Sequence, residues 1–314
     1  MQKRGLLILS LFVLTLMLAG VAQAKPVTIR YFGHTFDPTN NLVKEMIPEF
    51  EKENPDIKVE YEYIGAGEME EKLLTELAAG VGPDLWHVRD RSFLTFQSVG
   101  AMAPVVPSAF GLNTSEEVAA LYDEGTTTAY TIDGVLYGIP KEHNIITLYY
   151  RMDHFAEVGL DPNSPPETWE ELVEFGKKLT KRDNRNRLLR AAFDWPDISS
   201  GKLTRFAALL YQAGGDFFAE DMSESIINSP AGLKAAQTWT LPIEAGVADP
   251  AFMIEDDFQN DRVSMTTSGP YFPSDIRTNY PHLEYGKHYA AARNPHIAGG
   301  EEAALFTGWA WVVN

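Results

Sequence analysis

Two hydrophobic periodicities alternate along the chain after residue 26, and this alternation constrains the fold more than any other feature. Apolar residues recur at every second position in 27–32 and 57–64, which is the spacing of half-buried strands. The segments 38–53 and 68–79 carry apolar residues at helical spacing, and a short apolar run follows at 84–88. This order predicts a mostly parallel sheet with helices on both faces and ligands beyond the carboxyl ends of its strands. The loops of interest are therefore those after Phe32, Ile64 and Val88.

Two local signals further along the chain predict specific turns. The dipeptide Asp133-Gly134 is typical of a tight hairpin turn and predicts a short strand on either side. Thr168 is placed to cap a helix, and Glu171, three residues later, is placed to complete a capping box. A helix is therefore expected to begin after Thr168.

Composition bounds the class of protein. With 314 residues, 45% of them hydrophobic, the chain is long enough for two domains. A formal net charge of −18 would repel a phosphate backbone, so nucleic acid is not expected as a partner. The absence of cysteine excludes disulfides, thiolate metal sites, thiol nucleophiles and a lipid anchor of the bacterial lipoprotein kind.

The N-terminus has the three parts of a secretory signal peptide. Lys3 and Arg4 form a positive region, 6–18 is an apolar run, and 22–24 is a small-x-small cleavage site. The apolar run is short for a membrane span and no stop-transfer charges follow it. We therefore expect cleavage after Ala24 and a periplasmic product.

The common catalytic and metal-binding motifs are missing. No Gly-x-Ser-x-Gly, His-Glu-x-x-His or complete P-loop occurs in the sequence, and Gly65–Glu70 lacks the third glycine of a dinucleotide loop. The acidic cluster at 256–261 lacks the turn glycine and the closing glutamate of a calcium loop. One enzyme class stays open, a secreted glycoside hydrolase, although no spacing singles out its pair of carboxylates.

Seven segments, taken in order, resemble a known family. Its helix, glycine turn and Pro-Asp strand are similar to 78–86, and its Asp-Gly hairpin with the Tyr-Gly-Ile-Pro entry to a hinge is similar to 131–140. The other matching segments are 148–155, 159–160, 166–172, 213–216 and 265–271. Together they resemble the extracellular solute-binding proteins of ABC importers, in the group that includes the maltose-binding protein. One departure is Arg151, where that family usually has asparagine.

The resemblance implies a fold and a function. The fold is an α/β, two-lobed periplasmic-binding-protein fold of type II, with one lobe at 25–141 plus 304–314 and the other at 142–303. Because family members usually extend well past this point and 305–314 is an apolar run without a polar tail, we expect the second lobe to be incomplete. Such a protein is a monomer without cofactor, metal or catalysis, which closes by a Venus-flytrap hinge on a sugar, an oligosaccharide above all. It delivers the sugar to membrane permease subunits.

Eight residues are candidate ligand contacts, because a sugar presents hydroxyl groups to polar side chains and flat C–H faces to aromatic rings. Asp90 and Arg91 resemble the family's hydroxyl-binding pair, with a surface ion pair as the alternative. Tyr271 matches a stacking aromatic, and its alternative is an ordinary core ring. The remaining candidates are two hinge residues, a histidine after the first strand, an aromatic of the second lobe and a tryptophan after a glycine, namely Glu142, Asn144, His34, Trp195 and Trp309.

Overall fold

The computed structural model describes residues 25–35, 37–65, 67–194, 201–249, 256–304 and 306–314. The predicted signal peptide and Trp195 lie outside the described residues. The chain divides into two compact units. Unit 1 extends to Glu142 and resumes from Gly308 to Asn314, and unit 2 is His143–Thr307. The sequence analysis predicted that the chain crosses from one lobe to the other after residues 141 and 303.

Unit 1 contains a five-stranded sheet in the order β2-β1-β3-β12-β6. Strand β1 runs parallel to both β2 and β3, and β12 runs antiparallel to β3. The predicted parallel pairing of the first three strands is thus confirmed, and the sheet is mixed because β12 returns from far along the chain. The strands are β1 Val27–His34, β2 Ile57–Ile64, β3 Leu85–Arg89, β6 Ile139–Ile145 and β12 Phe306–Val313.

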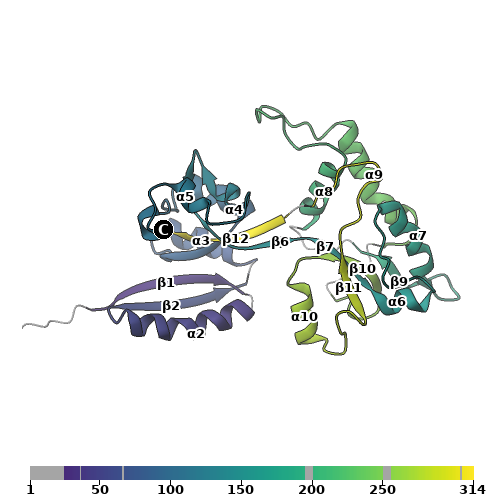
Figure 1. Ribbon diagram of the computed structural model, residues 1–314, viewed down its shortest axis with the longest axis horizontal. Helices are drawn as coiled ribbons and strands as arrows, with labels where there is room; N and C mark the ends of the chain where they lie inside the picture. Colours follow the sequence, from purple (N-terminus) through teal and green to yellow (C-terminus); the bar gives the residue numbers. More distant parts are fainter. Residues whose placement is uncertain (1–24, 36, 66, 195–200, 250–255, 305) are drawn as a thin grey trace, which may run out of the picture. The chain divides into compact units, whose positions relative to one another are not determined.

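Helices join these strands in the predicted order. Figure 1 shows α2, Asp37–Glu53, lying along β1 and β2. The predicted hairpin is also present, because β4, Thr131–Ile132, pairs with β5, Val135–Leu136, across Asp133-Gly134, both of which have positive φ. The other helical segments of unit 1 are α3 Met69–Ala78, α4 Asp90–Ser98, η1 Pro107–Phe110, α5 Ser115–Ala119 and η2 Thr128–Tyr130.

Large side chains fill the core of unit 1. Trp86 of β3 and Phe93 of α4 are fully buried, and Tyr130 packs edge-on against Phe93. Trp309 of β12 belongs to the same buried cluster. This core holds the carboxyl ends of β1 and β3 against the two strands that come from later in the sequence.

Unit 2 has its own five-stranded sheet, in the order β11-β7-β10-β9-β8. Strand β7 runs antiparallel to its neighbours β10 and β11, while β9 and β10 are parallel. The strands are β7 Thr147–Arg151, β8 Lys181–Arg182, β9 Leu188–Phe193, β10 Val263–Ser268 and β11 Tyr289–Ala292.

The predicted helix after Thr168 is present as α7, Trp169–Leu179. The hydroxyl of Thr168 accepts a hydrogen bond from the backbone N–H of Glu171 at 3.1 Å. The Glu171 carboxylate accepts from the N–H of Glu167 rather than from Thr168, so only half of the predicted capping box forms. The other helices of unit 2 are α6 Met152–Glu157, α8 Gly201–Gln212, α9 Pro230–Glu244 and α10 Phe272–Asn279.

The helices of unit 2 cover a second core. Helix α7 packs on β9, and α9 packs on α7 and α8 (Figure 1). Leu148, Phe155, Trp169, Phe193 and Met265 form the centre of this core. Among the residues that the structure describes, no helix has the length and apolar character needed to cross a membrane.

Candidate ligand-binding site

Four strands of unit 1 bring candidate residues together at one edge of the sheet. The parallel strands β1 and β3 end at His34 and Arg89, and Asp90 follows at the start of α4. The antiparallel strand β12 places Trp309 opposite Arg89. Strand β6 carries Glu142. The strand order predicted that ligand residues follow the carboxyl ends of strands. In the structure, residues at these positions lie in one cluster and contact their neighbours.

Asp90 connects α4 to β12. Its Oδ2 accepts a hydrogen bond from the backbone N–H of Gly308 at 2.8 Å, and its Oδ1 accepts from the N–H of Arg91 at 2.7 Å. A carboxylate has about four lone-pair sites. Two of them are therefore used inside the protein, and the others can accept hydrogen bonds from a ligand.

Arg91 does not pair with Asp90 through its side chain. Its guanidinium lies 3.4 Å from the Glu70 carboxylate of α3, and the side chain is 45% exposed. Together these two residues line a small surface pocket of about 290 Å³. The predicted Asp-Arg pair is adjacent in sequence, but the two side chains bond different parts of unit 1.

His34 and Trp309 are in direct contact. Their rings are stacked, with centroids 4.0 Å apart and planes 4° apart. The guanidinium of Arg89 also lies over the indole, 4.7 Å from its centroid. Trp309 is only 7% exposed. The stack covers one face of the indole, so Trp309 offers little ring surface to a sugar in this structure.

Behind His34 lies a buried polar chain that the sequence did not predict. The backbone N–H of His34 donates to Nδ1 of His87 at 3.1 Å, and the two Nδ1 atoms are 3.0 Å apart. The Nε2 atom of His87 lies 2.6 Å from the hydroxyl of Tyr31, which also accepts from Nε1 of Trp311 at 2.9 Å. Burial lowers the pKa of His87 to about 2 and also lowers that of His34, so both imidazoles are neutral near pH 7.

Glu142 is ionised. Burial raises the pKa of its carboxyl group, but a hydrogen bond from protonated His34 and the contact with Lys141 outweigh this effect and hold the pKa at about 2. The Nζ atom of Lys141 lies 2.7 Å from Oε2 of Glu142, and Nε2 of His34 lies 3.5 Å from Oε1. Glu142 therefore presents a fixed negative charge with a strong bond on one oxygen only.

In unit 2, Tyr271 follows Gly269 and Pro270 at the end of β10. A Cβ atom at Gly269 would lie 2.5 Å from the Tyr271 ring, so only glycine lets the ring take this position. Arg205 of α8 donates to the Thr267 hydroxyl at 2.7 Å and to the Thr267 carbonyl at 2.8 Å. Burial lowers the pKa of Arg205, and the neighbouring side chains of Asp194 and Tyr271 oppose this shift. Polar groups and a ring thus surround the carboxyl ends of β9 and β10.

Two further predicted residues belong to unit 2. Asn144 lies on β6 and is half-buried. Its amide has no hydrogen-bond partner within the described part of the chain, so it can bond a guest molecule. Trp195 lies outside the described residues.

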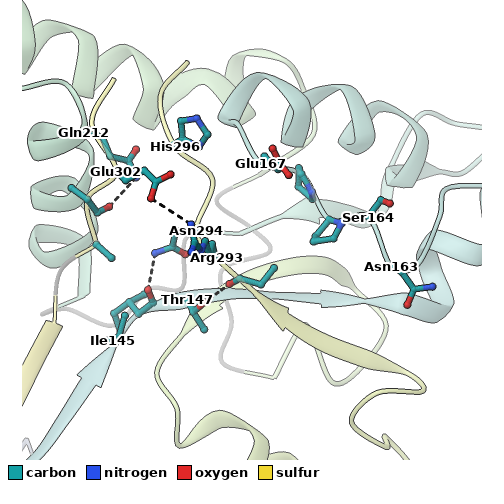
Figure 2. Close-up of a pocket in the computed structure, with 16 residues that line it drawn as sticks. Ile145, Thr147, Asn163, Ser164, Glu167, Gln212, Arg293, Asn294, His296 and Glu302 are labelled. Atoms are coloured by element: carbon teal, nitrogen blue, oxygen red, sulfur yellow. Dashed lines mark hydrogen bonds and ion pairs between the residues drawn. The ribbon is translucent and has the colours of Figure 1, made fainter. Parts of the chain in front are cut away.

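A pocket of about 670 Å³ opens in unit 2 beside β7, and none of the predicted residues lines it. Figure 2 shows Gln212 and Asn294 at one side of it. Gln212 donates to the carbonyls of Pro295 and Ala303, both at 3.1 Å. Asn294 donates to the Ile146 carbonyl at 2.7 Å, and its buried Oδ1 has no partner in the described residues.

Sequence reasoning missed the residues that support the candidate contacts. His87 was the available signal, because it is a polar residue inside the apolar run 84–88 of a predicted strand. A polar residue at such a position needs a buried partner. The partners Tyr31 and Trp311 belong to strands that are distant in sequence, so their identity could not be derived from periodicity.

The comparison with known proteins decides the class of this chain. The model of the bacterial extracellular solute-binding proteins matches residues 37–314. The chain belongs to this family. It is therefore a binding protein and not an enzyme, and the glycoside hydrolase alternative gains no support from the comparisons.

Similar proteins bind small hydroxylated solutes. An ABC transporter solute-binding protein of Thermotoga lettingae, solved with α-D-tagatose, is 26% identical with a TM-score of 0.75, over 92% of this chain and 72% of that one. A lactose-binding protein of Rhizobium radiobacter is 26% identical over 74% of this solute-binding protein and 52% of its own length. An sn-glycerol-3-phosphate-binding periplasmic protein of Escherichia coli is 31% identical over 53% of this chain and 39% of its own. The fold is the two-lobed α/β fold of these periplasmic binding proteins.

Proposed function

We propose that this solute-binding protein captures a sugar, an oligosaccharide above all, and delivers it to the permease subunits of an ABC importer. Relatives bind lactose and tagatose, which supports a sugar as the class of ligand. Delivery to a permease is supported by the Thermotoga relative, which is an ABC transporter solute-binding protein. The description of its family as extracellular solute-binding proteins supports a place of action outside the cytoplasm.

The observation that carries the choice of a sugar is the pair of carboxylates in unit 1. Asp90 and Glu142 both lie at the edge of the sheet where the candidate residues gather, and each keeps lone pairs that no residue described in the structure uses. Carboxylates accept hydrogen bonds, and sugar hydroxyl groups donate them. The two groups therefore suit a neutral ligand that carries several donors.

The same pair argues against a phosphorylated solute, although one relative binds sn-glycerol-3-phosphate. A phosphate ester needs guanidinium groups or backbone N–H groups, and two fixed negative charges repel it. The cations near the pair are engaged within unit 1: Arg91 contacts Glu70, Lys141 contacts Glu142, and Arg89 lies over the Trp309 ring. The arrangement in unit 1 thus favours hydroxyl donors over anions.

The eight candidate residues have different parts in this proposal. Asp90 and Glu142 accept from hydroxyl groups, Asn144 and Arg91 supply further polar contacts, and Tyr271 offers its ring to a C–H face. His34 and Trp309 form a buried wall behind the carboxylates, and Trp195 adds a second aromatic contact. Capture needs no chemistry, because a ligand shifts a hinge equilibrium by its differential affinity for the closed form.

A thermal-shift assay tests the proposal. Purified protein is heated with maltose, maltotriose, lactose, D-tagatose or sn-glycerol-3-phosphate, each at millimolar concentration. A sugar that binds the folded state raises the melting temperature, since its binding free energy adds to stability. We expect a rise with at least one of the sugars and none with the phosphate. A rise with sn-glycerol-3-phosphate alone would contradict the sugar assignment.

Localisation and assembly are tested separately. We propose that the signal peptide is removed after Ala24 and that the protein works as a monomer in the periplasm, without nucleic acid. Mass spectrometry of the product secreted by a Gram-negative host would show Lys25 as the first residue. Small-angle scattering of the same product would give the mass of one chain and a smaller radius of gyration with the bound sugar.

A further inference from the structure

The buried polar chain behind Glu142 has one consistent set of proton positions. The N–H of the His34 backbone has a fixed direction, and it donates to Nδ1 of His87. That nitrogen is therefore an acceptor without a proton. Neutral His87 then carries its proton on Nε2, which lies 2.6 Å from the hydroxyl oxygen of Tyr31. The Tyr31 oxygen accepts this proton together with the N–H of Trp311.

The position of the proton on His34 follows from His87. The two Nδ1 atoms are 3.0 Å apart, and a contact this short between two lone pairs is repulsive. Because Nδ1 of His87 has no proton, Nδ1 of His34 must carry one. A neutral imidazole holds a single N–H, so Nε2 of His34 has none.

The bare Nε2 of His34 faces Glu142. The distance to Oε1 is 3.5 Å, which is longer than a hydrogen bond and agrees with two acceptors that do not bond each other. Oε2 of the same carboxylate is held by Lys141 at 2.7 Å. Oε1 is thus the oxygen of Glu142 that is free to accept from a ligand.

We propose that His34 and His87 are positioning residues that keep Oε1 of Glu142 available to a ligand hydroxyl, and that protonation of His34 withdraws this oxygen. A proton added to Nε2 creates a donor directed at Oε1, and the resulting ion pair competes with the ligand. The inference rests on the proposed function, in which Glu142 contacts the ligand. Tyr31 lies further back, where its hydroxyl oxygen accepts from Nε2 of His87 and from Nε1 of Trp311.

The charges around the two imidazoles determine how the affinity for the ligand changes with pH. Burial lowers the pKa of His34 most, the positive charges of Lys141 and Arg89 lower it further, and Glu142 raises it. Glu142 stays ionised down to about pH 2. In acid the free protein binds a proton at His34, and the sugar complex does not. Affinity is therefore full above the pKa of His34 and falls as the pH drops below it, by up to about tenfold for each pH unit.

The groups that face these two imidazoles come from four strands. They are Tyr31 of β1, Arg89 of β3, Lys141 and Glu142 of β6, and Trp309 and Trp311 of β12. The pKa values of His87 and Glu142 both lie at about 2, whereas the pKa of His34 is lowered from its ordinary value of 6.5.

The first experiment needs no ligand. Histidine side chains are labelled with ¹⁵N, and the couplings between ring protons and nitrogens identify which nitrogen of His34 and His87 carries the proton. At pH 7.5 we expect Nδ1–H on His34 and Nε2–H on His87, with a second proton on His34 in acid. Tyr31→Phe removes the acceptor for the Nε2 proton of His87, but the backbone N–H of His34 still requires an unprotonated Nδ1, so both tautomers should persist. A wild-type His34 with Nε2–H at pH 7.5 overturns the inference, even if a sugar binds.

The second experiment measures affinity for lactose and D-tagatose from pH 8 to pH 4.5. The His34→Phe variant keeps a ring against Trp309 but cannot bind a proton, so its affinity should be independent of pH. His282→Gln, an exposed histidine of unit 2, is the matched control and should follow the wild type. An equal loss of affinity in acid for wild type and His34→Phe overturns the inference. If neither sugar binds the wild type, the proposed function fails for them, and the tautomer experiment still decides the inference.

Discussion

The imidazole of His34 lies parallel to the indole of Trp309, with ring centroids 4.0 Å apart. This contact joins the end of the first strand to the last strand of the chain, across 275 residues of sequence (309 − 34). Trp309 was expected to contact the ligand, but the face of its ring that stacks on His34 cannot stack on a sugar. Trp309 acts in this structure as a wall that fixes His34.

Replacement of Trp309 by alanine should therefore destabilise unit 1 more than it affects the chemistry of the site. The indole is buried in the core of that unit, and deletion of a buried tryptophan costs about 3–5 kcal/mol. Urea unfolding followed by circular dichroism measures the loss. Val313→Ala, at an exposed position of the same strand, should change stability by less than about 0.5 kcal/mol. An equal loss of stability in the two variants would contradict a structural role for Trp309.

Glu142 should be the most sensitive polar contact in unit 1. Glu142→Gln keeps the shape of the side chain but removes the charge, and a hydrogen bond to a charged group is worth about 1.5–3 kcal/mol. We expect affinity for the bound sugar to fall about 10- to 100-fold at pH 7.5, measured by fluorescence titration. Glu116→Gln, on the exposed face of α5, is the control and should bind like the wild type. An unchanged affinity in Glu142→Gln would remove this residue from the site.

Tyr271 should contribute through its ring rather than its hydroxyl. Tyr271→Phe is expected to keep affinity within about threefold, whereas Tyr271→Ala should lose about tenfold, because the ring supplies the contact with the C–H face. Gly269→Ala is a matched test, since its Cβ would lie 2.5 Å from the ring and displace it. Calorimetry on the three variants separates these effects. A larger loss in Tyr271→Phe than in Tyr271→Ala would contradict the stacking contact.

Asp194 should make stability depend on pH. Burial raises the pKa of Asp194 to about 7, although the charge of Arg205 opposes the shift. The folded protein therefore keeps a proton that the unfolded chain loses near pH 4, and stability falls as the pH rises from about 4 to 7. At 1.36 kcal/mol per pH unit the loss approaches about 4 kcal/mol.

Asp194→Asn tests this assignment, because asparagine does not titrate. The variant should lose less stability than the wild type between pH 4 and pH 8, as measured by urea unfolding at both values. Asp216→Asn, on the exposed turn after α8, serves as the control and should keep the wild-type dependence. Parallel pH profiles for wild type and Asp194→Asn would show that Asp194 is ionised in the fold.

Local patterns in the sequence were sufficient to predict the elements of the first half of unit 1. The alternation of strand and helix periods led to the parallel strands β1, β2 and β3, and the Asp133-Gly134 turn led to the hairpin. Each of these features depends on residues that are close in sequence. The antiparallel return of β12 depends on contacts over 200 residues, which no local period records.

The candidate site was predictable in its positions but not in its contacts. Residues after the carboxyl ends of strands were expected to gather, and His34, Asp90 and Glu142 do share one edge of the sheet in unit 1. Arg91 shows the limit of this reasoning, because a neighbour in sequence can turn its side chain to another element. The pocket beside Asn294 was missed, since its lining comes from five separate segments of unit 2.

The capture of a sugar is tested most directly by isothermal titration calorimetry at pH 7.5. Purified protein is titrated in turn with maltose, maltotriose, lactose, D-tagatose and sn-glycerol-3-phosphate. The account predicts saturable binding of at least one sugar with one site per chain, and no heat of binding for the phosphate. Silence with every sugar, or saturable binding of sn-glycerol-3-phosphate alone, would contradict it.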